Sequence, residues 1–407
     1  MTEANVHSER DAGDPGPRLL AVTLEFLRLG LTSFGGPVAH LGYFRQAFVV
    51  RRKWLSEQHY ADIVALCQFL PGPASSQVGM AIGFERAGYL GAIGAWAAFT
   101  LPSVVLLLAF AFGLEHWAGL APSGALHGLK VAALAVVAQA VWSMARHLAP
   151  DRPRQIVMAL AAAAVLLLPS GPMQLAVMAM AALWGALLGR SGPVPPEAEG
   201  AVIAENRGVA AGLLVVFFAV LIGLPLLAGW TGNPVLRVAD IFYRAGALVF
   251  GGGHLVLPLL QSQLVPTGLM ARDVFLAGYG ATQAVPGPLF AFAAFAGATL
   301  LAPPNGVGGA ALALVAIYLP SFLLVLGVLP FWYRLRGNVR LRSALDGVNA
   351  AVVGLLVAAL YDPVFTGAVG RPADLALAVL ALAGLALLRL PPWLVVLLCA
   401  GAGTALG

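Results

Sequence analysis

The stretch "CQFLPGPASSQVG", residues 67–79, interrupts a long apolar run with Pro-Gly-Pro, two serines and two glutamines. A related stretch, "TQAVPGPLFAF", occurs at residues 282–292. Proline cannot continue a helix, and the glycine between two prolines permits a sharp reversal of the chain. Each stretch therefore predicts a broken helix, with a new half-helix beginning just after the second proline.

The composition around these stretches is that of a membrane protein. Hydrophobic residues make up 60% of the 407 positions and charged residues 10%, whereas soluble domains carry about 25% charged residues. Runs such as "GLLVVFFAVLIGLPLLAG" approach the length that crosses a bilayer. We predict an all-α polytopic membrane protein. Residues 1–18 are polar and rich in Pro and Gly and lack the features of a signal peptide, so we expect a disordered cytoplasmic tail.

The chain contains an internal duplication. "FLRLGLTSFGGP", residues 26–37, aligns without a gap with "FYRAGALVFGGG", residues 242–253. Three further landmarks follow in the same order in both halves: Gln68 with Pro71-Gly72-Pro73 matches Gln283 with Pro286-Gly287-Pro288, Leu101-Pro102-Ser103 matches Leu319-Pro320-Ser321, and "ALHGLK" from Ala125 matches "ALDGVN" from Ala344. Four landmarks in one order at similar spacing indicate two homologous halves.

Each half is predicted to contain six segments, and one apolar helix at about 208–230 joins the halves. The segments lie near 19–45, 58–83, 87–113, 124–147, 154–169 and 172–189, and near 236–262, 273–300, 307–333, 342–362, 373–389 and 391–406. An odd connector inverts the second half relative to the first, as in inverted-repeat transporters. The predicted units are a first repeat at 19–190, a loop and connector at 191–235, and an inverted second repeat at 236–407.

The basic residues favour re-entrant hairpins for the first two segments of each half. If these segments leave the membrane on the side where they enter, almost all loop cations fall inside and only Arg237, Arg272 and Arg371 fall outside. If the segments span instead, the cluster at 45–53 moves outside. Both arrangements place the amino terminus in the cytoplasm and the carboxyl terminus outside.

The broken helices indicate an anion site. A half-helix that begins at membrane depth exposes free N–H groups and the positive end of its dipole. Non-helical backbone is tolerated there only where it lines a cavity or is buried in protein, so the alternative is a kink that serves packing alone. The candidate substrate-binding residues are Arg28, Gly35, Gly36, Gln68, Pro71, Gly72, Pro73, Ser75, Ser76, Lys130, Arg244, Gly251, Gly252, Gln283, Pro286, Gly287 and Pro288.

Arg28 and Arg244 occupy equivalent positions within apolar segments, where a charge faces a cavity or a partner. One hypothesis places both in a shared central cavity. The other pairs them with acids on their own helices, because Glu25 precedes Arg28 by three residues and Asp240 precedes Arg244 by four.

The remaining charged candidates carry weaker signals. Lys130 lies near a predicted helix end, where a lysine often reaches for the interface without binding a ligand. Glu25, Asp62 and Asp346 are candidate proton carriers because they are rare acids near apolar segments. The alternative for each is a paired structural carboxylate.

These motifs resemble those of the long-chain members of the chromate ion transporter family. The resemblance rests on "FGGPVAHLGYFRQAFV", "WLSEQHYADIVALCQFLPGPASSQVGMAIG" and "AGYLGAIGAWAAFTLPS" in the first half, and on "FGGGHLVLPLL" and "GYGATQAVPGPLF" in the second. It extends over about residues 20–406. It implies a bacterial inner-membrane protein that exports chromate, confers chromate resistance and uses the proton gradient or the membrane potential.

Two other functions are compatible with part of this pattern. A passive oxyanion channel, or a transporter of sulfate or another oxyanion, is the alternative to chromate export. The chain contains no HExxH and no GxSxG sequence, so we do not expect an enzyme. The expected partners are chromate, with sulfate as a second cargo, and the lipid bilayer, but not nucleic acid. The sequence is compatible with a homodimer but does not determine the oligomeric state. Neither a cofactor nor a metal is expected.

Overall fold

The computed structural model describes residues 15–116, 123–168, 171–189, 207–249, 256–332 and 338–406, and these ranges contain helices and turns but no strand. The predicted tail lies mostly outside the described residues, although helix α2 begins at Pro15, before the expected boundary. In the first half the helices are α2 (Pro15–Thr32), α3 (Gly36–Phe44), the π-helical η1 (Arg45–Arg51), α4 (Glu57–Phe69), α5 (Ala74–His116), α6 (Ser123–Leu148), α7 (Arg152–Leu167) and α8 (Gly171–Leu188).

Helix α9 (Arg207–Thr231) connects this half to the second. The second half contains α10 (Pro234–Ala247), α11 (Val256–Leu264), α12 (Arg272–Ala284), the short η3 (Leu289–Ala291), α13 (Phe292–Ala298), α14 (Gly306–Val328), η4 (Leu329–Phe331), α16 (Val339–Ala359), η5 (Leu360–Phe365), α17 (Thr366–Ala368), α18 (Pro372–Ala386) and α19 (Pro392–Leu406). The predicted all-α class is confirmed, and so is the division into two repeated halves with broken helices.

The broken segments of the first half double back on themselves. Glu25 in the middle of α2 forms ion pairs with Arg51 and Arg52, which follow the break at residues 33–35 and end the returning arm. In the next segment His59, in the first turn of α4, lies 2.9 Å from Glu85, near the end of the arm that begins at Ala74. Both segments therefore form hairpins: the returning arm of the first ends beside the middle of α2, and the two ends of the second lie together.

The equivalent segments of the second half are also hairpins. The N–H of Leu301, just after α13, donates to the carbonyl of Leu269, just before α12, at 3.0 Å. Helix α10, which ends at Ala247, and helix α11, which begins at Val256, pack against each other. The four hairpins are called H1 (15–51), H2 (57–86), H3 (234–264) and H4 (272–298) below.

H2 continues directly into the long third segment through a sharp reversal. The backbone leaves helical geometry at Ala87 and at Gly88, whose φ is +63°. A methyl group at Gly83 would lie 2.3 Å from the carbonyl oxygen of Gly91, and one at Gly297 would lie 2.2 Å from that of Gly309. In each half, therefore, a close glycine-to-glycine contact joins the last arm of the hairpin (H2 or H4) to the segment that follows it.

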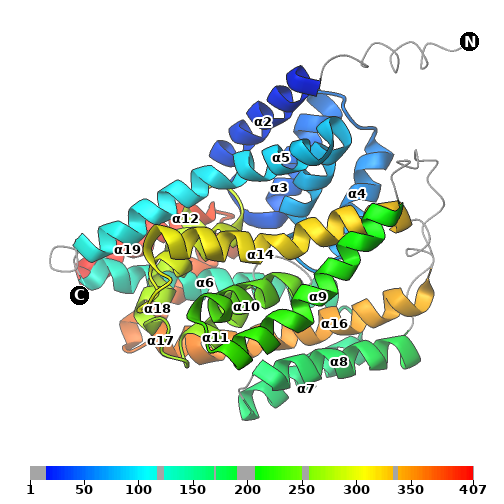
Figure 1. Cartoon of the computed structure of the whole chain (residues 1–407). Coiled ribbons are helices and arrows are strands. Elements are labelled where there is room, and N and C mark those ends of the chain that lie inside the picture. Colours follow the sequence, from blue (N-terminus) through cyan, green and yellow to red (C-terminus); the bar gives the residue numbers. More distant parts are fainter. Residues whose placement is uncertain are drawn as a thin grey trace, which may run out of the picture.

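The two halves exchange their last helical pairs. Helices α7 and α8 of the first half pack along α16 of the second, and α18 and α19 pack along α6 (Figure 1). Glycines permit the closest approach on each side. A methyl group at Gly128 would lie 2.1 Å from the carbonyl oxygen of Cys399, and one at Gly347 would lie 2.1 Å from that of Ala181. Each half thus completes the other.

A contact between a basic and an acidic residue joins each exchanged set, with the two residue types reversed between the halves. His127 Nε2 on α6 lies 2.8 Å from Asp374 Oδ1 on α18. On the other side Asp346 Oδ2 on α16 lies 2.9 Å from Arg154 Nη2 on α7. His127 and Asp346 are equivalent positions of the duplication. The central helix therefore supplies the basic residue in one half and the acidic residue in the other, and the contact with the exchanged pair is present in both.

The described part of the chain contains five helical stretches that are long and apolar enough to cross a membrane: Ala74–Gly113, which includes the reversal at Ala87 and Gly88, His127–Leu148, Arg207–Thr231, Gly306–Phe331, and Val339–Ala368, which runs from α16 through η5 and α17. Their outer faces carry exposed leucines and valines, such as Leu90 and Val105 of α5 and Val215 and Leu226 of α9. Exposed large apolar side chains in such numbers would be unfavourable in water but suit contact with lipid. The chain is a multi-pass membrane protein.

Candidate functional site

The breaks of the hairpins meet in the protein interior, and the halves bond to each other there. The N–H of Gly72 in H2 donates to the carbonyl oxygen of Val249 in H3 at 2.6 Å. The N–H of Gly287 in H4 donates to the carbonyl oxygen of Ser33 in H1 at 2.9 Å. Gly72 and Gly287 are equivalent positions, and so are Ser33 and Val249. We call this reciprocal contact, formed by residues 33–36, 70–73, 249 and 285–288, the crossing.

The crossing requires glycine between the prolines. Gly72 has φ of +124° and Gly287 has φ of +96°, a region that residues with a side chain rarely adopt. There is also little room. A methyl group at Gly72 would lie 2.8 Å from Ser321 Oγ, and one at Gly287 would lie 2.2 Å from Ser103 Oγ. Ser103 Oγ donates to the carbonyl oxygen of Pro286, so the repeated Leu-Pro-Ser landmarks belong to the crossing.

A polar half-helix begins at the crossing. Helix α5 starts directly after Pro73, and its first N–H groups have no acceptor within the helix. Ser75 and Ser76 are both only 2% exposed. Gln77 Nε2 donates to the carbonyl oxygen of Pro71 at 2.7 Å, which closes the break. His40 from α3 places Nδ1 3.3 Å from Ser75 Oγ.

Buried polar atoms without a protein partner gather around this half-helix. The hydroxyl of Tyr318 on α14 lies close to those of Ser76 and Thr100, but none of the three makes a hydrogen bond of good geometry to another. Buried polar groups are normally hydrogen-bonded, so such a concentration indicates a place for a polar ligand. The atoms are Ser33 Oγ, His40 Nε2, Ser76 Oγ, Gln77 Oε1, Thr100 Oγ1, Tyr318 Oη and Ser321 Oγ. Most of them belong to hydroxyls, which can donate to an oxyanion without carrying charge.

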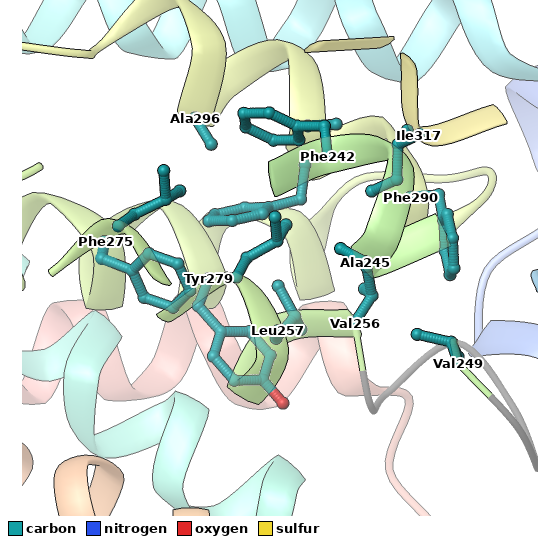
Figure 2. Close-up of a cluster of buried hydrophobic side chains, with 14 of the residues drawn as sticks. Phe242, Ala245, Val249, Val256, Leu257, Phe275, Tyr279, Phe290, Ala296 and Ile317 are labelled. Carbon is teal, nitrogen blue, oxygen red and sulfur yellow. The ribbon is translucent and has the colours of Figure 1, made fainter. Parts of the chain in front are cut away.

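The second half contributes an apolar wall instead. The residues after Pro288, from Leu289 to Phe292, are buried and apolar, whereas Ser75 and Ser76 stand at the equivalent place in the first half. Phe290 lies near Val249 and Ile317 (Figure 2). The half-helix of H4 is therefore part of the packed core, and the polar lining is one-sided.

The two repeated arginines pair with acids on their own helices. Arg28 Nη1 lies 4.0 Å from Glu25 Oε1, and the Arg28 side chain is 60% exposed. Arg244 forms an ion pair with Asp240. Glu25 is buried and also holds Arg51 and Arg52. These contacts favour the ion-pair hypothesis over a shared central cavity.

Other charged candidates are held by partners away from the crossing. Lys130 Nζ lies 2.6 Å from Asp273 Oδ1 at the start of α12. Asp346 pairs with Arg154. Asp62 is half-buried on α4, one turn after His59. Lys130 and Asp62 therefore lie at arms of H4 and H2, and neither of these two ion pairs involves a residue of the crossing.

The remaining candidates follow the course of the breaks. Gly35 and Gly36 have φ of +100° and +77° and form the break of H1. Gln68 is exposed, whereas Gln283 is buried and its Nε2 has no protein partner. Gly251 and Gly252 lie outside the described residues.

Comparison with known proteins decides the family. The sequence model described as "Chromate transporter" matches residues 20–186 and again residues 236–404. The chain belongs to the chromate transporter family. The chromate transport protein of Pseudomonas aeruginosa is 30% identical over 85% of this chain and 80% of its own length.

Other family members match over a similar range. The probable chromate transport protein of Synechococcus elongatus is 28% identical over 85% of this chain and 84% of its own length. The chromate transport protein of Cupriavidus metallidurans is 26% identical over 85% of this chain and 82% of its own length. No solved structure matches the fold. The two family matches coincide with the two halves that exchange bonds at the crossing.

Sequence reasoning found the breaks and missed much of their surroundings. His40, Ser33, Thr100 and Tyr318 were not candidates. One signal pointed to part of the set, because Thr100 and Tyr318 are equivalent and each directly precedes a Leu-Pro-Ser landmark.

Proposed function

We propose that this protein exports chromate from the cytoplasm and binds it at the polar side of the crossing. The observation that carries the proposal is the half-helix after Pro73, which begins in the buried interior among unpartnered hydroxyls of a chromate transporter family member. Broken helices that meet at a repeat interface are the usual substrate site of inverted-repeat transporters.

The chemistry of the lining suits a tetrahedral oxyanion. Free N–H groups at the start of α5 and the positive end of its dipole attract negative charge. The hydroxyls of Ser75, Ser76 and Tyr318 supply further donors from two directions. Hydrogen bonds to a charged group contribute a net stabilisation of about 1.5–3 kcal/mol each relative to water, so several of them favour the bound dianion.

The proposed direction follows from the membrane potential. An interior-negative potential favours outward movement of a dianion by about 4.6 kcal/mol per 100 mV, because each elementary charge contributes about 2.3 kcal/mol. Import would have to overcome the same amount. We place the protein in the bacterial inner membrane with the amino terminus inside and the carboxyl terminus outside, where export confers chromate resistance.

The alternative is a passive oxyanion channel or a transporter of sulfate or another oxyanion. Neutral donors do not by themselves separate two tetrahedral dianions of similar size. The reciprocal contact between the halves favours alternating access, because two equivalent breaks in an inverted repeat can open in turn to either side.

The proposed site keeps the break residues of H1, H2 and H4 and adds new ones. The proposed site consists of Gly35, Gly36, Pro71, Gly72, Pro73, Ser75, Ser76, Gln283, Pro286, Gly287 and Pro288, together with Ser33, Thr100 and Tyr318. Arg28 and Arg244 are tested separately. Because acids on their own helices hold them, we expect Arg28→Gln and Arg244→Gln to lower stability more than chromate affinity.

The test is uptake of radiolabelled chromate and sulfate into everted vesicles, with and without a proton gradient. Pro71→Ala combined with Pro73→Ala lets the helix continue and should abolish uptake. Ser76→Ala removes one buried hydroxyl, worth about 1–3 kcal/mol, and should weaken apparent affinity about tenfold or more. Ser143→Ala, on the exposed face of α6, is the matched control.

Each outcome decides between the candidate functions. Saturable chromate uptake that responds to the imposed gradient supports transport, whereas uptake that rises without saturation indicates a channel. Preference for sulfate over chromate would change the cargo. Normal chromate uptake by the double proline variant would show that the break serves packing, and the proposed site would be wrong.

A further inference from the structure

His40 is a buried ionisable side chain at the crossing that the proposed binding of chromate leaves without a role. It is 0% exposed and comes from α3, the returning arm of H1. Its Nδ1 lies 3.3 Å from Ser75 Oγ. The ring stands edge-on to Phe99, with centroids 5.2 Å apart. Its Nε2 is buried and has no protein partner.

The position of His40 joins two features of the crossing. On one side it contacts Ser75, which begins the polar half-helix. On the other it lies within reach of the backbone of Ser33, whose carbonyl oxygen accepts the N–H of Gly287 from the second half. A change in the hydrogen bonds of this imidazole therefore acts both on the oxyanion site and on the contact between the halves.

Charged groups on the neighbouring elements are occupied elsewhere. Helix α3 packs against η1 and α5. On η1, Arg45 pairs with Glu57 and Arg51 pairs with Glu25. The remaining charged or titratable groups nearby are Glu85, which pairs with His59, Arg86, which lies over the ring of Trp54, and Tyr60, which donates to the carbonyl oxygen of Leu41.

We propose that His40 takes up a proton when the oxyanion binds and is the residue that links transport to pH. The inference rests on the proposed function. A neutral imidazole has one donor and one acceptor, whereas the protonated ring has two donors. When Nδ1–H donates to Ser75 Oγ, the Ser75 hydroxyl is free to donate to the ligand. The bound dianion in turn stabilises the imidazolium, because the single positive charge of the ring neutralises half of the charge of the dianion in an otherwise neutral lining.

His40 is a better proton carrier than Glu25 or Asp346. Glu25 is held by three arginines and Asp346 by Arg154. Protonation of either would break an ion pair remote from the crossing. His40 needs no such loss, because the Ser75 hydroxyl and the Phe99 ring that it contacts carry no charge.

The experiment measures protons taken up per oxyanion bound. Full-length protein in lipid nanodiscs is titrated with chromate by calorimetry in two buffers of different ionisation enthalpy, at a pH where free chromate is the dianion. We expect the wild type to take up as much as one proton per oxyanion. His40→Gln keeps hydrogen-bonding groups but cannot titrate, and should bind chromate without proton uptake. His59→Gln is the control, since His59 lies at the base of H2, and should behave as wild type.

The outcomes separate this inference from the proposed function. Chromate binding by the wild type without proton uptake, or equal uptake by His40→Gln, overturns the role of His40 alone. Absence of any chromate or sulfate binding by the wild type refutes the proposed site itself. If His40→Gln does not fold, the pH dependence of sulfate affinity in the wild type tests whether binding takes up a proton. A fall of about tenfold per pH unit on the alkaline side supports uptake of one proton, and an affinity that does not change with pH overturns it.

Discussion

Replacing Gly287 with alanine tests the packing of the crossing. Gly287 has φ of +96°, and a left-handed conformation costs a residue with a side chain about 1–2 kcal/mol. The new methyl group would also lie 2.2 Å from Ser103 Oγ and 3.2 Å from the carbonyl oxygen of Phe99. Overpacking of this kind costs about 1–3 kcal/mol. We therefore expect Gly287→Ala to lower the free energy of unfolding by about 2–5 kcal/mol in total.

Two other glycines separate these contributions. Gly88 has φ of +63°, but a methyl group added there would have no neighbouring atom within 4 Å, so Gly88→Ala should cost only the conformational part, about 1–2 kcal/mol. Gly212 lies within α9 with open space around it. Gly212→Ala should stabilise the protein by about 0.5–1 kcal/mol, because glycine is a poor helix former.

The assay is unfolding of the purified variants by a denaturing detergent, followed by the loss of helical circular dichroism. The expected order of stability is Gly212→Ala, wild type, Gly88→Ala and Gly287→Ala. If Gly287→Ala is no less stable than Gly88→Ala, Ser103 moves aside at little cost. The crossing would then be loosely packed, and our account of it would be wrong.

Three further predictions concern the ion pairs and the hairpins. Arg154→Asp should destabilise the protein by leaving Asp346 beside a like charge, and the double exchange with Asp346→Arg should restore most of the unfolding free energy in the same assay. Glu85 raises the pKa of His59, at the base of H2 outside the spanning helices, above its ordinary value of 6.5. The stabilising effect is therefore complete below pH 6.5 and is lost as pH rises through the raised pKa, so the melting temperatures of wild type and His59→Gln should converge at alkaline pH. A cysteine at Arg51 should react with impermeant maleimide only from the cytoplasm, and labelling from outside would convert H1 into a spanning segment.

Local chemistry explains which parts of the fold could be predicted. The breaks at 70–73 and 285–288 follow from Pro-Gly-Pro alone, because proline ends a helix whatever surrounds it. The duplication was visible because both halves keep the same landmarks in order. The exchange of helical pairs was not predictable in this way, because the sequence of α6 does not determine whether it packs on α8 or on α19. That choice is made by tertiary contacts such as Gly128 against Cys399.

The candidate site shows the same division. Ser75 and Ser76 were found because they follow the break directly. His40 was not, because it lies 35 residues from Ser75 in the sequence and meets it only when H1 packs on H2. For Arg28, helix spacing allowed both a cavity and an ion pair, and the 4.0 Å separation of Arg28 Nη1 from Glu25 Oε1 favours the ion pair.

The exchange of helical pairs has a consequence for synthesis in the cell. Helix α6 enters the membrane early, but α18 and α19, which cover it, are translated only after α16. Until then its packing face, including Gly128, must be shielded by lipid, by the insertion machinery or by a chaperone. The same arrangement predicts that the two halves can be made as separate chains and still assemble. Two chains separated within residues 190–206 should assemble into one transporter when made together, while either half made alone should be degraded.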